Sequence, residues 1–259
     1  TFLDQPDVDL AEPGSVPDLI GQIEPELVIN AAAYTAVDKA ESEPQLAERI
    51  NAQAPRVMAK TCQILGIPLM HYSTDYVFDG TASTPYTEKA RVAPKSVYGR
   101  TKLAGEESVA KETDRHIILR TAWLYSHIGH NFLKTMLRVA SEGKPLRVVD
   151  DQMGSPTFAW DLGMASVALV EALESGRDDV YGIFHVTNAG VTSWYGFAQK
   201  IFELAKRDQV DLTPISTESY PTPAPRPAYS VLDCDRLDRV AGVKMPDWQD
   251  ALARCIARL

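Results

Sequence analysis

The chain has 259 residues, 45% of them apolar and 24% charged, which allows a sizeable core in one or two domains and excludes an intrinsically disordered protein. No apolar run approaches the roughly 18 residues that span a bilayer, and no basic segment followed by an apolar one opens the chain, so neither a membrane nor a secreted protein is indicated. The net charge of −9 argues against nucleic acid as the main partner, although a local arginine or a helix N-terminus can hold a diphosphate in an acidic protein.

The cysteines and histidines give no sign of a disulfide or a metal. Cys62, Cys234 and Cys255 are far apart, odd in number and without metal-ligand spacing. We predict that they are buried free thiols in a reducing compartment, which favours a cytoplasmic protein. The five histidines form no recognisable ligand set, so the residues predict no metal site.

Strands and helices alternate through the first half of the chain. The pattern predicts a buried strand at 27–29 and a helix over 44–65 that Gly66 closes. The other predicted elements of this half are a strand over 67–73, a helix over 97–111, a strand over 116–122 and a helix over 131–142. This alternation indicates an α/β fold with a doubly wound parallel sheet, Rossmann-like, in which ligands bind at the carboxyl ends of the strands.

The second half is less regular. Four prolines in residues 220–227 predict a rigid extended loop, and Ser193 is predicted to cap a helix that runs to about residue 207. A final helix is expected to begin at Pro246 and Asp247. The final helix is expected to place Trp248, Leu252, Cys255 and Leu259 on one face. The other predicted elements of this half are a loop over 150–156, a helix over 160–174 and a strand over 182–187.

Two domains are predicted from this order. Residues 1–147 plus roughly 157–187 would form a dinucleotide-binding domain, and roughly 148–156 and 188–259 a smaller C-terminal substrate-binding domain. A dinucleotide fold opens with a strand and a Gly-rich turn, but no Gly-x-x-Gly-x-x-Gly is present, and the segment 7–10 resembles the end of a later strand. We therefore expect the fold to lack its first βα unit, about 30 residues.

Tyr98 and Lys102 are the first candidates for chemistry. Their spacing of four puts both side chains on one face of the predicted helix. An ammonium group close to the phenol would lower the pKa of Tyr98 toward neutral, and such a tyrosine can protonate a carbonyl oxygen while hydride arrives at its carbon. Alone this pair is a weak signal, because a surface tyrosine and lysine at a helix start would look the same.

Thr74 strengthens the signal. It follows the predicted strand over 67–73, and a hydroxyl there can donate to the same carbonyl oxygen that Tyr98 protonates. The alternative is an ordinary turn at the end of a strand, with Asp75 in a cap-like role.

The segment 30–35 fits a cofactor wall, since small side chains at the end of a strand let a ribose or nicotinamide approach the backbone. Close packing between strand and helix would explain the same alanines. Asp9 is a candidate partner for the adenine amino group or simply ends its strand.

Two residues are candidates for substrate binding. Arg226, in the proline-rich loop, is able to hold a diphosphate through its planar guanidinium group, or else faces solvent. Trp123 either stacks on a sugar or base or belongs to the core.

Seven segments together resemble the dTDP-4-dehydrorhamnose reductase family of extended short-chain dehydrogenases. They are NAAAYTAVDKAE (30–41), HYSTDYVF (71–78), YGRTKLAGE (98–106), RTAW (120–123), DQMGSPT (151–157), the loop from Arg226 to Asp233, and PDWQ (246–249). The resemblance covers nearly all of residues 4–259. It implies reduction of the C4 keto group of a dTDP-linked 6-deoxyhexose, giving dTDP-L-rhamnose with NADPH or NADH.

The resemblance also implies roles for single residues. The catalytic residues of the family fall on Thr74, Tyr98 and Lys102, and Lys102 also falls on a contact to the nicotinamide ribose. Substrate-contacting positions fall on Tyr76 and Trp123, and cofactor positions on Asp9, Leu10, Ala32, Ala33 and Thr35. Some members dimerise through glutamates around magnesium, so a homodimer and magnesium are implied by the resemblance only.

Two other functions remain open from the sequence. A nucleotide-sugar epimerase or dehydratase of the same superfamily would keep its nicotinamide through the cycle. The regulatory subunit of a methionine adenosyltransferase resembles this family and is not catalytic, but the retention of Thr74, Tyr98, Lys102 and Arg226 favours catalysis.

Overall fold

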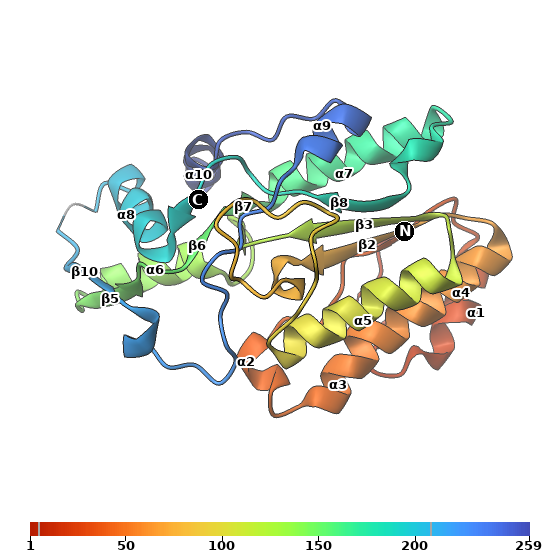
Figure 1. The fold of residues 1–259 in the computed structure, drawn as a ribbon, viewed down its shortest axis with the longest axis horizontal. Coiled ribbons are helices and arrows are strands. Elements are labelled where there is room, and N and C mark those ends of the chain that lie inside the picture. The colour runs from red at the N-terminus through yellow and green to blue at the C-terminus, as the bar shows by residue number, and fades with distance from the viewer. Residues whose placement is uncertain (5, 208) are drawn as a thin grey trace.

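Buried apolar runs form a central parallel sheet. A computed structural model describes residues 1–4, 6–207 and 209–259. Four strands lie in the order β1 (Val28–Asn30), β2 (Leu69–Thr74), β3 (His116–Thr121) and β8 (Gly182–His185), and each adjacent pair is parallel (Figure 1). All four strands were predicted, with bounds that differ by a few residues.

Helices cover both faces of this sheet. In β3, Ile117 and Leu119 pack into one apolar cluster and Ile118 into another, because successive side chains of a strand point to opposite faces. One face is covered by α4 (Ala54–Leu65) and α5 (Val97–Glu112), and the other by α7 (Ala159–Glu174) and α9 (Asp235–Ala241) (Figure 1). The predicted parallel sheet covered on two faces is confirmed.

The helix predicted over 44–65 contains a π-helical turn. It consists of α3 (Pro44–Glu48), the π turn Arg49–Gln53 and α4, and it ends as predicted at Gly66, which has φ of +69°. The amide of Asn51, inside the π turn, bonds to both backbone groups of Tyr34 and to the Thr101 hydroxyl. The turn therefore ties this helix to the segment after β1 and to α5.

A second apolar core lies beyond the sheet. It is built from α6 (Phe132–Ser141), α8 (Trp194–Leu204), α10 (Trp248–Ile256) and the parallel pair β5 (Leu146–Val149) and β10 (Leu212–Ile215), which lie together at one end of the molecule (Figure 1). The Ser193 hydroxyl caps α8, as predicted, by accepting from the backbone N–H of Gly196 at 2.9 Å. The two-domain division stays a prediction.

The remaining elements are short. They are α1 (Val16–Ile23), α2 (Val37–Ala40), β4 (Leu124–Tyr125), β6 (Met153–Gly154), β7 (Thr157–Phe158), β9 (Thr192–Ser193) and the 3-10 turns Pro13–Ser15, Asp75–Val77, Asp178–Val180 and Thr217–Ser219. β6 interrupts the loop predicted over 150–156 by pairing with β9. The proline-rich segment 220–227 is neither helix nor strand, as predicted.

Two local predictions are wrong. Residues 7–10 are not the end of a strand but turns and irregular chain ahead of α1. Leu259 is 58% exposed, because α10 ends at Ile256 before it can bring that side chain to the face shared by Trp248, Leu252 and Cys255. Cys62 and Cys255 are buried free thiols, as predicted, and Cys234 is a half-buried one. Within the described residues, no helix has the length and apolar composition to cross a membrane.

Candidate active site

Polar side chains meet at the carboxyl ends of the central strands. In register, Asn30 at the end of β1 lies opposite His71, and Thr74 at the end of β2 lies opposite Thr121. This edge of a parallel α/β sheet is where such folds bind ligands. Thr74 is followed directly by the 3-10 turn Asp75–Val77, and its hydroxyl caps this turn by accepting from the backbone N–H of Tyr76.

The start of α5 brings Tyr98 and Lys102 to this edge. The Ser96 hydroxyl accepts from the backbone N–H of Gly99 at 3.1 Å, and the Glu41 carboxylate accepts from the N–H of Val97 at 2.7 Å. A carboxylate at a helix N-terminus is favourable because it meets unpaired N–H groups and the positive end of the helix dipole. The two caps fix the first turn of α5 and with it the direction of Tyr98.

Gly99 allows this helix start to approach the turn after β2. A Cβ atom at position 99 would overlap the carbonyl oxygen of Tyr76, which is backbone and cannot move aside alone. A residue without a side chain is therefore required between the two candidate catalytic residues.

We expect Gly99→Ala to lower the free energy of unfolding by about 1–3 kcal/mol, the usual cost of forcing extra atoms into a packed site. Urea denaturation with equal m-values would measure it. Gly21→Ala is the matched control, because Gly21 lies on an exposed face of α1 with nothing within 4 Å of the added carbon. That change should stabilise the protein by up to about 1 kcal/mol, so equal effects of the two substitutions would contradict the packing argument.

Tyr98 and Thr74 come together as predicted. Tyr98 is half-buried, and its ring packs edge-on against that of Tyr76, with 5.5 Å between centroids. Burial raises the pKa of Tyr98 to about 12, hydrogen bonding to Thr74 lowers it, and the Asp75 carboxylate raises it further. The predicted lowering of this pKa by Lys102 is wrong, and the phenol is neutral near pH 7, in the state that can donate a proton.

Lys102 is turned toward the strand. Its side chain is buried, and its ammonium group donates to the carbonyl oxygen of Tyr72 at 2.6 Å and lies 3.4 Å from Nε2 of His71. Burial lowers the pKa of Lys102 to about 8. The negative charge of Glu106 raises this pKa and so offsets part of the effect of burial. The ammonium group is therefore directed at the Tyr72 carbonyl and the His71 ring.

His71 is a site residue that the sequence analysis missed. Its Nδ1 lies 3.0 Å from the Asn30 amide and its other ring nitrogen faces Lys102, and burial together with the Lys102 charge lowers the pKa of His71 well below its usual range. The imidazole is thus neutral and links the end of β1 to the candidate lysine. The available signal was a polar residue inside the apolar run of β2.

Arg226 reaches from the proline-rich loop to α2. Its guanidinium group pairs with the Asp38 carboxylate at 2.7 Å, and Asp38 also accepts from the backbone N–H of Ala224 at 3.2 Å. The side chain is therefore not free in solvent, and the hydrogen bonds and charge of the loop lower the pKa of Asp38 although burial opposes them. Asp38 was also missed, although it lies in the segment 30–41 that carries the resemblance.

Trp123 occupies a strained and packed position. It is half-buried with φ of +49°, in the left-handed region, and its ring stacks on Trp194 with 3.6 Å between centroids. A Cβ atom on Gly154 would overlap the Trp123 ring. The residue thus lies between the sheet and the second core.

The predicted cofactor residues fall into two groups. Ala32, Ala33 and Thr35 follow the end of β1, where Ala32 and Thr35 are exposed and the N–H of Ala32 donates to the Asn30 side chain at 3.2 Å. Asp9 and Leu10 lie ahead of α1, where Asp9 is exposed and accepts from the N–H of Ala11 at 2.9 Å, and Leu10 is buried.

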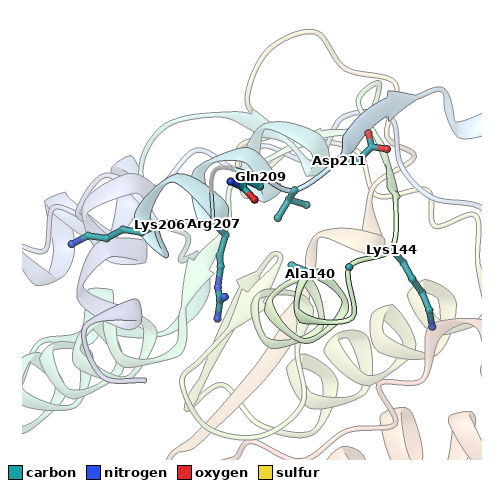
Figure 2. Close-up of a pocket in the computed structure, with 8 residues that line it drawn as sticks. Ala140, Lys144, Lys206, Arg207, Gln209 and Asp211 are labelled. Atoms are coloured by element: carbon teal, nitrogen blue, oxygen red, sulfur yellow. The ribbon is translucent and has the colours of Figure 1, made fainter.

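A hollow of about 500 Å³ lies elsewhere, between α6 and the segment after α8. Its cationic side chains point in different directions, Lys206 and Lys144 to opposite sides (Figure 2), so they do not converge on one anion. Among the residues that the structure describes, no group of three or more His, Cys, Asp or Glu side chains is placed to hold a metal ion.

Comparison with known proteins identifies the family of the chain. The family model described as RmlD substrate binding domain matches residues 1–259. A dTDP-4-dehydrorhamnose reductase of Sinorhizobium fredii is 44% identical over 259 residues, 98% of this chain and 87% of the relative.

Two solved structures are similar over almost the whole chain. A dTDP-4-dehydrorhamnose reductase of Clostridium acetobutylicum superposes with a TM-score of 0.93 at 41% identity, covering 99% of this chain and 89% of its own. The enzyme of the same name from Bacillus anthracis, in complex with NADP, has a TM-score of 0.93 at 38% identity with the same coverage. The chain therefore belongs to the family of the RmlD substrate binding domain, the dTDP-4-dehydrorhamnose reductases.

Proposed function

We propose that the chain reduces the C4 keto group of dTDP-4-dehydrorhamnose to give dTDP-L-rhamnose, with NADPH or NADH as the hydride donor. The names of its relatives support this reaction, and one similar structure contains NADP. The observation that carries the proposal is the neutral phenol of Tyr98 beside the Thr74 hydroxyl, at the carboxyl ends of the strands.

The reaction forms one C–H and one O–H bond. When bound, the nicotinamide would provide the hydride for C4 of the sugar. Tyr98 donates its phenolic proton to the carbonyl oxygen as negative charge develops there. Thr74 holds the same oxygen by a hydrogen bond, and a proton from solvent restores the phenol after each turnover.

The residues around the end of β1 suit a nicotinamide nucleotide. Ala31 and Ala32 are small and exposed, so a ribose and ring can approach their backbone. Lys102 has three donors and bonds to Tyr72 and His71, which leaves one for a ribose hydroxyl. Asp9, Leu10, Ala33 and Thr35 complete the proposed cofactor contacts.

Substrate binding is assigned to Tyr76, Trp123 and Arg226. Asp38 holds the guanidinium group of Arg226 in place, and the remaining N–H donors of that group suit a diphosphate. The substrate would then lie between the proline-rich loop and Tyr98.

We expect Arg226→Lys to raise KM for the dTDP-sugar at least about tenfold, since a lysine keeps the charge but loses the planar pair of donors. Steady-state kinetics at saturating NADPH would measure this, and kcat should change less. Arg147→Ala, on the exposed side of β5, is the control. A KM for Arg226→Lys equal to that of the control would rule out a diphosphate contact.

The test of the function is NADPH oxidation with dTDP-4-dehydrorhamnose by the purified protein. One NADPH consumed for each dTDP-rhamnose formed is the expected result. An epimerase or dehydratase would convert a nucleotide sugar with no net consumption of cofactor, and a regulatory subunit would show no turnover. The homodimer, the use of magnesium and the cytoplasmic location stay predictions.

A further inference from the structure

The proton of the Thr74 hydroxyl already has an acceptor. Thr74 Oγ1 donates to Oδ1 of Asp75 at 2.9 Å, and both side chains are buried. The same oxygen accepts from the backbone N–H of Tyr76 at 3.2 Å. A hydroxyl has a single hydrogen, so in this arrangement Thr74 presents only lone pairs to the site and cannot donate to a substrate oxygen.

Asp75 lies in surroundings that oppose its charge. It is 2% exposed, and its Oδ2 atom has no hydrogen-bond partner among the described residues. Burial raises the pKa of Asp75 to about 6, although the hydroxyls of Thr74 and Ser230 lower it. The titratable groups that face it are the phenols of Tyr76, in the same turn, and Tyr98, on α5, and Ser230 reaches it from the loop before α9.

The proposed reaction makes this charge more unfavourable. Hydride transfer places negative charge on the substrate oxygen. This is the oxygen to which Thr74 and Tyr98 are proposed to hydrogen-bond. An ionised carboxylate one hydroxyl away would repel that charge at short range in a site from which the substrate excludes water. A neutral carboxyl group at the same place would not.

We propose that Asp75 is a positioning residue that takes up a proton when substrate binds, donates it to Thr74 Oγ1, and so turns the Thr74 hydroxyl toward the keto oxygen. This inference rests on the proposed function. The proton comes from solvent, stays on Asp75 through hydride transfer and returns to solvent on product release, so the overall reaction still consumes one hydride and one proton.

The test is the pH dependence of two kinetic constants. In the wild-type protein, kcat/KM should be level below about pH 6 and fall as pH rises, by up to tenfold per unit, because an ionised free enzyme must first take up a proton. The value of kcat should stay level over the same range, because Asp75 is already protonated in the complex. In Asp75→Asn the amide is always neutral and can donate to Thr74, so kcat/KM should lose this fall and keep near the wild-type value at low pH.

Asp79→Asn is the matched control. Asp79 is a half-buried aspartate of the same loop that also accepts a threonine hydroxyl, from Thr81 at 2.9 Å, but hydrogen bonds keep its pKa low. This variant should retain the wild-type profile.

A second measurement requires no turnover, and its main observation is made on the wild-type protein. Infrared difference spectra of the wild-type protein with NADP⁺ and dTDP-rhamnose should show the carbonyl stretch of a protonated carboxyl group above pH 6. The same band should be absent from a folded Asp75→Asn protein. A wild-type pH profile in Asp75→Asn, a folded Asp75→Asn without activity, or a wild-type complex without the band would each overturn the role of Asp75. Lack of turnover by the wild-type protein would instead contradict the proposed function.

Discussion

Replacing Tyr98 with phenylalanine is expected to lower kcat at least about 100-fold, the scale of a lost general acid. The substitution removes one oxygen atom and keeps the ring that packs edge-on against Tyr76. Lys102 is held by Tyr72 and His71 rather than by the phenol, so the affinity for NADPH should be nearly unchanged. Single-turnover oxidation of NADPH would measure the chemical step, and fluorescence titration the cofactor affinity.

Tyr195→Phe is the control for this experiment. Tyr195 is a half-buried tyrosine on α8 whose hydroxyl accepts from Gln199 at 3.1 Å, away from the sheet edge. Its loss should leave kcat unchanged. If Tyr98→Phe also turned over at the wild-type rate, the proton would have to come from another group, and the assignment of the site would be wrong.

Much of the fold was predictable because its signals are local. Ser193 and Gly66 mark helix ends through hydrogen bonds and backbone angles that involve only nearby residues. Alternating apolar runs and helical stretches located all four strands of the central sheet. The proline-rich segment 220–227 was predictable since proline cannot donate to a ladder.

The elements that were missed depend on distant partners. The parallel pair β5 and β10 joins residues that lie more than 60 positions apart, and nothing in either short run points to the other. The segment 7–10 has the apolar pattern of a strand, but Leu10 is buried against α1 and α4 instead of pairing. Tertiary packing decided both outcomes.

In the site, too, the features set by local sequence were predictable and those that depend on distant contacts were not. Tyr98 and Lys102 lie in the first turns of one helix, as their spacing predicted. Thr74 lies at the end of a strand, also as predicted. The protonation states did not follow from spacing, because they depend on burial and on the rotamer that directs Lys102 to Tyr72. The Asp38–Arg226 pair joins residues 188 positions apart, which no local pattern reveals.

The helix that carries Tyr98 is held to the sheet by a buried ion pair. Glu106, two turns after Tyr98 on α5, accepts three charge-assisted bonds from Arg120 on β3, at 2.9 and 3.2 Å from Nε and 2.6 Å from Nη2. Both side chains are only 3% exposed. Arg120 also lies 5.2 Å from the ring centroid of Phe78, so it joins α5, β3 and the loop after β2.

We expect Glu106→Ala to lower the free energy of unfolding by about 3–5 kcal/mol, because it leaves the Arg120 charge buried without a partner. Urea denaturation would measure the loss, and Glu142→Ala, in the exposed pair with Arg138, should change stability little.

The double variant Glu106→Leu with Arg120→Met separates two explanations of that loss. If the loss comes from an unpaired buried charge, apolar side chains of similar volume should restore most of the stability, since neither then needs a partner. If the pair itself supplies the stability, the double variant should be at least as unstable as Glu106→Ala. Arg120 Nη1 has no hydrogen-bond partner among the described residues, so the guanidinium group is already incompletely paired in the native protein. This incomplete pairing favours the first outcome, in which the ion pair fixes the direction of α5, and so of Tyr98, more than it stabilises the fold.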